Sequence, residues 1–260
     1  MTLRETVAIT TKDGVCSVSL HRPEGKGPFP PVIFAMDGFG PRASLLAVAD
    51  RIASAGYVVA LPDLYYRGGS VLSVLPPGSP HDIASVLPLV MGNPEIRAQW
   101  RDRFYAPATN PANIETDLGA VLELLGARAD VRPGAAGIVG YCMGGNIALR
   151  AAAIFGSRIA AAGVFHGGNL ALDAPDSPHL GAPKIKARVF VAAAIEDPSF
   201  TDEMRERLEK ALTDAKVSHV IETYPAKHGF CIPDMPTYDA TAAERHYEAV
   251  TKLFAQALGA

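Results

Sequence analysis

The chain has 260 residues, which is the length of one large α/β domain. Hydrophobic residues make up 48% of it and charged residues 20%, as in an ordinary globular protein. With 24 Lys and Arg against 27 Asp and Glu, the net charge is −3, and no basic stripe occurs, which argues against a nucleic-acid partner.

Two alternating runs at residues 7–9 and 15–20 flank the segment Thr11-Lys12-Asp13-Gly14. Asp-Gly between two such runs is a strong turn signal, so the sequence predicts an N-terminal β-hairpin. A Pro-rich stretch then leads into three further predicted elements: a buried strand at 32–36, a helix at 45–52 that ends near Gly56, and a strand at 57–61.

The pattern becomes irregular between residues 64 and 113, where prolines interrupt it. We interpret this segment as an insertion near the active site. Alternation then resumes, with helices predicted near 114–125, 146–152, 204–212 and 241–258, and strands near 136–139, 160–165, 187–193 and 217–224. Strands alternating with helices predict a mainly parallel sheet with helices on both faces. No repeat or linker divides the chain, so we expect one α/β domain over residues 1–260.

The three cysteines, Cys16, Cys142 and Cys231, have no metal-ligand spacing. An odd, sparse number of cysteines is typical of a reducing compartment. The first residues lack the apolar core of a signal peptide, and no apolar stretch is long enough to span a membrane. We therefore expect a cytoplasmic protein, a monomer or homodimer, with no metal, no cofactor and no membrane partner.

Gly140-Tyr141-Cys142-Met143-Gly144 has the glycine framing of a nucleophile elbow, with cysteine as the nucleophile. An apolar run precedes it and a predicted helix follows, which is the setting that the motif requires. The start of that helix would favour a thiolate at Cys142. The alternative is a small buried core residue, but such a residue needs no cluster of glycines.

A base is expected on a loop beyond the carboxyl end of a strand. His228 directly follows the last predicted strand and is the leading candidate. His166 also follows a strand and is its rival, although it lies close behind the nucleophile in sequence.

The orienting acid should follow another strand and precede the base. Asp197 meets this condition and gives the chain order nucleophile, acid, base that this type of fold uses. Glu196 is its immediate neighbour, so either carboxylate could be the orienting one. His228 would take the thiol proton and Asp197 would fix its tautomer. The backbone N–H groups of Met143 and Gly38 are the expected oxyanion donors.

Four segments together resemble the dienelactone hydrolase family: the elbow, Leu61-Pro62-Asp63-Leu64-Tyr65, the Asp197 loop and His228-Gly229-Phe230. The resemblance covers nearly the whole chain and implies an α/β-hydrolase fold. It also implies that Cys142, Asp197 and His228 form a catalytic triad. In that family the cysteine attacks an ester or lactone carbonyl, and water hydrolyses the acyl-enzyme.

Two positions depart from the family pattern. Asp37 stands where the family has a glutamate that contacts the thiol, so that contact is expected to be lost or bridged by water. Ile232 stands where an arginine binds the substrate carboxylate. Candidate substitutes are Arg67, Arg97, Arg101 and Arg103, and Tyr141 is a further candidate for a supporting role.

The sequence therefore predicts a cysteine hydrolase of a small ester or lactone. One alternative is a protein that keeps the hydrolase scaffold and binds a small ligand without turnover. Another is a hydrolase of a different acyl substrate, such as a thioester. Residues 64–113 shape the pocket but carry no motif that separates these alternatives.

Overall fold

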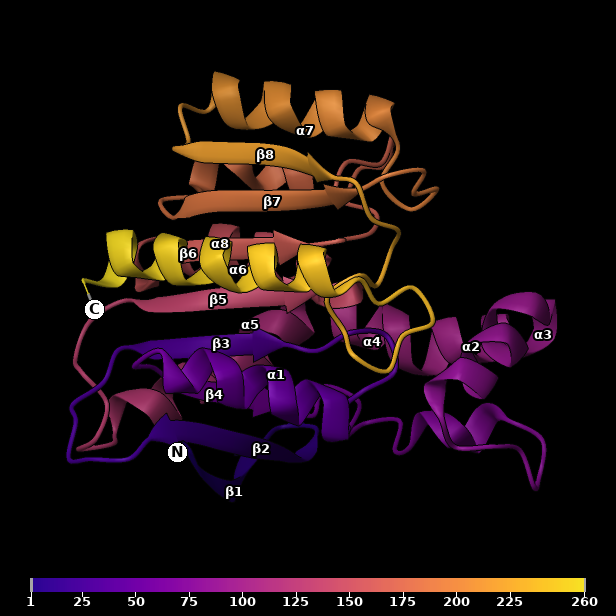
Figure 1. Ribbon diagram of the computed structural model, residues 1–260, viewed down its shortest axis with the longest axis horizontal. Helices are drawn as coiled ribbons and strands as arrows, with labels where there is room; N and C mark the ends of the chain where they lie inside the picture. Colours follow the sequence, from indigo (N-terminus) through magenta and orange to yellow (C-terminus); the bar gives the residue numbers. More distant parts are fainter. Residues whose placement is uncertain (1, 260) are drawn as a thin grey trace.

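An eight-stranded sheet runs through the molecule in the computed structural model, which describes residues 2–259 (Figure 1). The strand order is β1-β2-β4-β3-β5-β6-β7-β8. The strands are β1 (Thr2–Thr11), β2 (Gly14–Pro23), β3 (Pro31–Ala35), β4 (Val58–Pro62), β5 (Ala136–Tyr141), β6 (Ile159–Phe165), β7 (Arg188–Ala194) and β8 (His219–Tyr224). All neighbours from β4 to β8 pair in parallel, which confirms the predicted mainly parallel sheet.

The predicted N-terminal hairpin is confirmed. β1 and β2 pair antiparallel, and Thr11 lies opposite Gly14 across the Asp-Gly turn. β2 then pairs antiparallel with β4, which attaches the hairpin to the parallel strands. Burial alternates along residues 6–11 of β1 and 15–20 of β2, whereas every residue of β3, β4 and β5 is buried. Strands covered on both faces must be apolar throughout, which is why these strands read as continuous hydrophobic runs.

Helices cover both faces of the sheet (Figure 1). On one face α1 (Ala43–Ser54) packs beside α8 (Ala240–Leu258), and on the other face α5 (Pro111–Gly126) packs beside α6 (Met143–Phe155). Helix α7 (Asp202–Asp214) packs against β8. Two short helical turns, η3 (Gly156–Arg158) and η4 (Pro178–Lys184), complete these layers. This arrangement is the α/β-hydrolase architecture that the sequence predicts.

The irregular segment 64–113 forms a helical projection beyond the carboxyl ends of the strands (Figure 1). It contains η1 (Val71–Val74), α2 (Ile83–Gly92), α3 (Pro94–Trp100), the π-helical turn η2 (Arg101–Tyr105) and α4 (Ala106–Thr109). Asn93 ends α2 and caps α3, because its side chain accepts hydrogen bonds from the first N–H groups of α3. Pro94 and Pro107 lie in the first turns of α3 and α4, where proline is tolerated, whereas Pro88 lies inside α2.

The chain order reverses at the neighbouring strands β3 and β5. From β3 the chain passes to β4 on one side, whereas β5 and the strands after it extend the sheet on the other side. Their register places Ala35 opposite Gly140, so the loops that begin at Asp37 and Cys142 leave the same edge of the sheet. In open α/β sheets ligands bind in the crevice at such a switch point.

Candidate active site

Cys142 occupies a strained turn between β5 and α6. Its backbone has φ 54° and ψ −114°, a conformation that L residues rarely adopt. Three hydrogen bonds hold it: its N–H donates to Phe165 O (3.2 Å), and its carbonyl accepts from the N–H groups of Gly145 (3.1 Å) and Gly168 (3.2 Å). The surrounding structure thus fixes the strained turn and holds the thiol at the N-terminus of α6.

Two glycines of the elbow are required by close backbone contacts. A Cβ atom on Gly140 would lie 1.9 Å from Gly144 O, and one on Gly144 would lie 2.1 Å from Ala35 O. Neither contact can be relieved by a side-chain movement, because both partners are backbone atoms. The glycine framing in the sequence therefore reflects how closely α6 approaches β3 and β5.

His228 and Asp197 form a hydrogen-bonded pair at the same edge of the sheet. Nδ1 of His228 lies 2.7 Å from Oδ2 of Asp197. An ionised carboxylate only accepts hydrogen bonds, so Nδ1–H is the donor and Nε2 is left for Cys142. Asp197 is buried and Glu196 is exposed, so the structure brings Asp197 and not Glu196 to the imidazole.

Ser199 is a partner of Asp197 that the sequence analysis missed. Its hydroxyl donates to Oδ1 of Asp197 at 2.6 Å, and its N–H donates to the same oxygen at 2.9 Å. Asp-Pro-Ser is a plausible signal for a turn in which an aspartate side chain bonds to the backbone two residues later. With Oδ1 held by Ser199, Oδ2 is left to orient His228.

Opposing effects set the protonation of the pair. Burial lowers the pKa of His228, but the negative charge of Cys142 and hydrogen bonds to Asp197 and Cys142 outweigh it and raise the pKa to about 10. Burial raises the pKa of Asp197, but the hydrogen bonds from His228 and Ser199 leave this pKa below its usual value. The site therefore favours the protonated form of His228, an imidazolium.

His166, the rival base, lies beside His228 but has no acid. The two ring centroids are 4.9 Å apart, and neither ring nitrogen of His166 has a hydrogen-bond partner among residues 2–259. Burial, together with the electrostatic effect of the neighbouring His228 and His246 side chains, lowers the pKa of His166 well below its usual value. His166 is thus a neutral wall of the site.

The two predicted oxyanion donors lie on adjacent loops. Among residues 2–259 no hydrogen-bond acceptor is recorded for the N–H of Gly38 or of Met143. The carbonyl of Gly38 is held by the hydroxyl of Tyr65 (2.8 Å) and by Nε1–H of Trp100 (2.9 Å). These bonds fix the loop after β3 while its N–H remains available to a ligand.

Asp37 is held in a buried ion pair. Its carboxylate accepts two hydrogen bonds from Arg42, each 2.8 Å long, and one from the N–H of Phe39 (3.0 Å). Arg42 also binds Asp234 through Nε (2.7 Å) and Nη2 (3.0 Å). The bridge joins the loop after β3 to the loop after His228. Asp234 is 192 positions from Arg42, so no local sequence signal could have revealed it.

A cavity of about 460 Å³ opens over Cys142 and His228. Its walls come from the sheet edge and from the projection, and most of them are apolar: Phe39, Leu87, Met91, Trp100, Tyr105, Met143, Ile232 and Met235. Ile232 contributes a hydrocarbon side chain where the family resemblance implies an arginine. The cavity is the place for a substrate next to the thiol.

The structure places only some of the candidate substrate-binding residues at this cavity. Arg97 and Arg101 lie at its wall and are exposed, whereas Arg103 does not line it. Arg67 lies outside it, because Asp13 and the buried Asp117 bind its guanidinium.

Tyr141, the candidate for a supporting or substrate-binding role, does not line the cavity. It is fully buried, and its hydroxyl lies 2.7 Å from Nε2 of His246. As the last residue of β5, it packs against Phe34 and Phe165, whose ring centroids lie 4.8 and 5.8 Å from its own.

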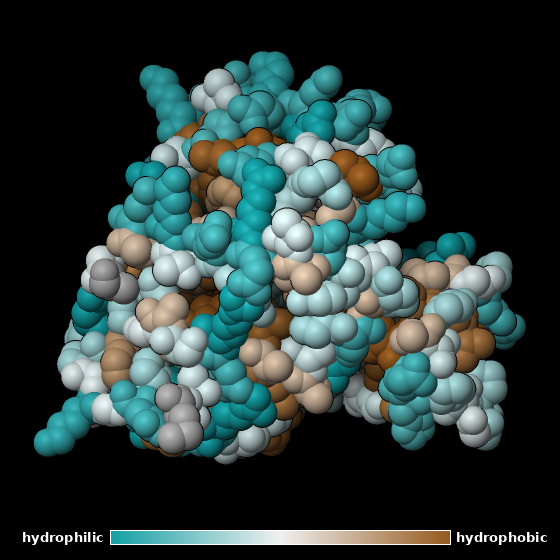
Figure 2. Space-filling model, viewed as in Figure 1, coloured by the Kyte–Doolittle hydropathy of each residue, from teal (hydrophilic) through white to brown (hydrophobic). Residues whose placement is uncertain are grey.

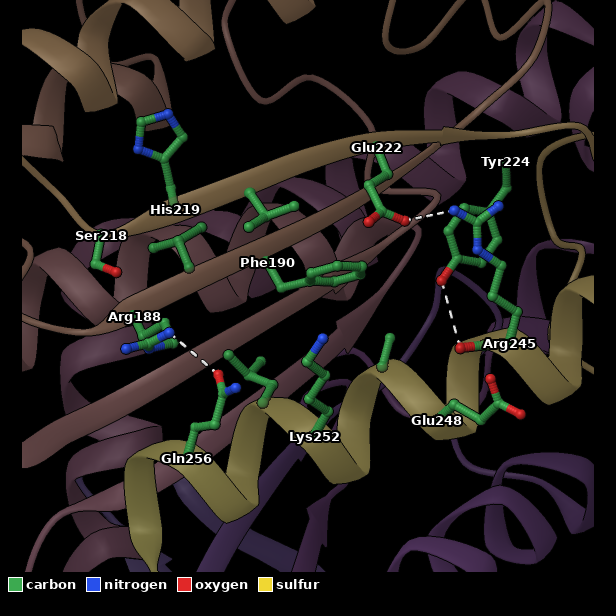
Figure 3. A pocket seen from close by; sticks show the side chains of 14 residues that line it. Arg188, Phe190, Ser218, His219, Glu222, Tyr224, Arg245, Glu248, Lys252 and Gln256 are labelled. Atoms are coloured by element: carbon green, nitrogen blue, oxygen red, sulfur yellow. Dashed lines mark hydrogen bonds and ion pairs between the residues drawn. The ribbon is translucent and has the colours of Figure 1, made fainter.

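A second hollow of about 280 Å³ lies between β7, β8 and α8 (Figure 3). Charged and polar side chains on its rim bind one another: Arg245 donates to Glu222 (2.6 Å) and Arg188 to Gln256 (3.1 Å). None of the predicted site residues lines it. The three predicted triad residues instead line the cavity over Cys142.

Residues 2–259 contain neither a candidate metal centre nor a candidate membrane-spanning helix. No group of three or more His, Cys, Asp or Glu side chains is placed there to hold a metal ion. No helix in that range combines the length and the apolar character needed to cross a bilayer.

Curated relatives align with most of this chain. A "Putative carboxymethylenebutenolidase" of Synechocystis sp. is 29% identical over 244 residues, which cover 90% of this chain and 89% of that protein. A protein of the same name from Escherichia coli K12 is 27% identical over 238 residues, which cover 90% of this chain and 79% of the relative.

A solved structure shows the same fold. The "Putative Dienelactone Hydrolase" of Klebsiella pneumoniae superposes with a TM-score of 0.82 at 23% identity, covering 98% of this chain and 99% of that one. The model of the dienelactone hydrolase family matches residues 17–258, a range that includes the elbow, Asp197 and His228. The chain therefore belongs to the dienelactone hydrolase family and is a hydrolase of the ester and lactone class.

Proposed function

We propose that this protein hydrolyses a small ester or lactone through an acyl-enzyme intermediate on Cys142. The observation that carries the proposal is the juxtaposition of a strained elbow cysteine with a His228–Asp197 pair in one cavity. In a triad of this kind the nucleophile contacts the base, and the base contacts the orienting acid.

The first half of the reaction forms the acyl-enzyme. The Cys142 sulfur, held as a thiolate by the His228 imidazolium and by the N-terminus of α6, attacks the carbonyl carbon. The carbonyl oxygen becomes an oxyanion and accepts hydrogen bonds from the N–H groups of Gly38 and Met143. When the carbon–oxygen bond breaks, the Nε2 proton of His228 passes to the leaving alkoxide.

The second half releases the acid. His228, now neutral, takes a proton from water as the water oxygen attacks the thioester carbon. The carbon–sulfur bond then breaks and restores the thiolate and imidazolium. Asp197 stays ionised throughout and holds the ring with Nδ1–H toward itself. In a lactone the leaving alkoxide remains attached to the product, which is released as a hydroxy acid.

The test is hydrolysis of aryl esters and lactones by the wild type and by Cys142→Ala. We expect kcat to fall by several orders of magnitude in the variant, because the nucleophile is lost. Cys16→Ala is the matched control, since Cys16 is a buried cysteine on β2 and does not line the cavity. Equal turnover by the wild type and Cys142→Ala would refute the proposal.

Chemical labelling and mass spectrometry also test whether Cys142 is the nucleophile. Iodoacetamide should label Cys142 below about pH 7, where an unperturbed thiol with a pKa of about 8.5 reacts slowly. Cys16 and Cys231 are buried and should remain unlabelled in the folded protein. After an acid quench during turnover, mass spectrometry should find the acyl group on the peptide that contains Cys142 and on no other.

A further inference from the structure

The inner wall of the cavity carries no unpaired cation. Arg42 does not line the cavity itself; it binds Asp37, which does, and it also binds Asp234. Its guanidinium is therefore already occupied. Among residues 2–259, the arginines that line the cavity are Arg97 and Arg101, and both are exposed on α3 and η2.

The inner wall and the ion pair next to it hold more carboxylates than cations. Asp37, which lines the cavity, and Asp234, which does not, bring two carboxylates to the guanidinium of Arg42. The further carboxylate of Asp197 is balanced by the imidazolium of His228. The Asp37 and Asp197 side chains are nearly fully buried, so solvent screens their charges less than it would at the surface. A carboxylate on the substrate would meet repulsion at this wall.

The remaining walls suit an apolar group. From the projection Leu87 and Met91 on α2, Trp100 on α3 and Tyr105 on η2 face the cavity, and Ile232 and Met235 line it from the loop after His228. Figure 2 shows hydrophobic surface on the projection next to the body of the molecule. Two aromatic rings, Trp100 and Tyr105, lie with centroids 5.4 Å apart and offer flat contacts to a ring.

We infer that the substrate is a neutral ester or lactone with an apolar, ring-sized body and no carboxylate. This inference rests on the proposed function and narrows it. The curated relatives carry a name that specifies a carboxymethylene group on a butenolide, so the substrate of this chain would differ from what those names state. The cavity volume of about 460 Å³ accommodates a molecule with one or two rings.

The decisive comparison uses a related pair of probes: methyl 4-acetoxybenzoate, which is uncharged, and 4-acetoxybenzoate, which has a negatively charged carboxylate in place of the methyl ester. Trp100 is the sole tryptophan in the sequence and lines the cavity, so its fluorescence reports binding there. We expect Cys142→Ala to bind the neutral ester at least about tenfold more tightly than the anion. Equal binding, or tighter binding of the anion, would overturn the inference.

Two variants in the Cys142→Ala background test the cause. Asp234→Asn removes one negative charge and should narrow the ratio of the two dissociation constants. Arg97→Gln should leave the ratio of the two dissociation constants unchanged. If this variant instead lost affinity for the anion alone, Arg97 would bind a substrate carboxylate, and the inference would again be overturned.

Turnover separates this inference from the proposed function. For the wild type, kcat/KM for each ester is divided by the rate constant for its hydrolysis by hydroxide, which corrects for intrinsic reactivity. The corrected kcat/KM should be higher for the neutral ester, by a factor similar to that in binding. If Cys142→Ala hydrolysed both esters as fast as the wild type, the proposed nucleophile would be wrong, yet the binding ratio would still decide the substrate class.

Discussion

The edge of the sheet and the helical projection contribute different things to one cavity. The edge supplies polar groups held by short hydrogen bonds, such as the 2.7 Å contact between His228 and Asp197. The projection supplies mainly apolar side chains on short helices, and its two arginines at the cavity are exposed. The reacting groups at the edge tolerate little displacement from their positions. Substitutions on the projection, by contrast, can change which substrate binds.

The comparison predicts that changes at the edge lower kcat, while changes on the projection alter KM. The largest effect is expected for Asp197→Asn. An amide at this position would no longer require Nδ1–H to face it, and His228 would lose its orienting charge. We expect kcat for an aryl ester to fall by about a thousandfold to ten-thousandfold.

Glu196→Gln is the matched control for Asp197→Asn, because it changes the adjacent carboxylate, which is exposed. It should leave kcat unchanged. Comparable losses in both variants would show that the charge of the loop, and not the contact with His228, supports the reaction.

A second large effect is expected for Arg42→Met, which breaks the bridge at the edge of the sheet. The variant leaves Asp37 buried without its cation. The free energy of unfolding should fall by about 3–5 kcal/mol, as measured by urea denaturation. Arg158→Met is the control: its partner Glu123 is exposed, so that pair should contribute about 0–1 kcal/mol. A similar small loss in both variants would contradict a structural role for the bridge.

The free energy of unfolding should depend on pH in the acid range because of a histidine buried behind the elbow. Burial lowers the pKa of His246 to about 3, whereas an unfolded histidine has a pKa of about 6.5. Between these values the unfolded chain binds a proton that the folded protein does not, so stability falls as the pH is lowered. His246→Gln should reduce this slope by about 1.4 kcal/mol per pH unit.

Tyr141→Phe separates the titration of His246 from its hydrogen bond. It removes the hydroxyl that lies 2.7 Å from Nε2 but keeps the imidazole buried. The variant should lose stability at every pH while its slope below pH 6.5 stays as in the wild type. Urea denaturation at a series of pH values measures both quantities, and an unchanged slope in His246→Gln would count against the low pKa.

The smallest effect is expected on the projection, for Leu87→Ala. The variant removes apolar contact area from the cavity, so KM for an aryl ester should rise by roughly fivefold, about 1 kcal/mol, with kcat unchanged. Leu180→Ala, an exposed leucine that does not line the cavity, should change neither constant. A large loss of kcat in Leu87→Ala would mean that the projection also positions the reacting groups.

Local sequence was sufficient where local backbone geometry decides the structure. The Asp-Gly turn predicted the hairpin, and alternating strands and helices predicted the α/β-hydrolase fold. The elbow could be recognised because Gly140 and Gly144 are required by close backbone contacts within a few residues of Cys142 and with β3. The position of a residue after a strand also indicated which side chains would lie at the carboxyl edge.

Only the tertiary structure decided which of these side chains meet. Asp197 and Glu196 are equivalent candidates in the sequence, but one is buried against His228 and the other is exposed. Arg67 is a candidate for substrate binding in the sequence, but in the folded protein Asp13 and Asp117 bind its guanidinium.

The bridge from Arg42 to Asp234 and the apolar walls of the cavity likewise depend on segments far apart in the chain. The amino-acid sequence by itself therefore determined the scaffold and the type of chemistry, since both follow from the backbone near each motif. Charge pairing and cavity lining depend on long-range packing, so they became visible only in the folded molecule.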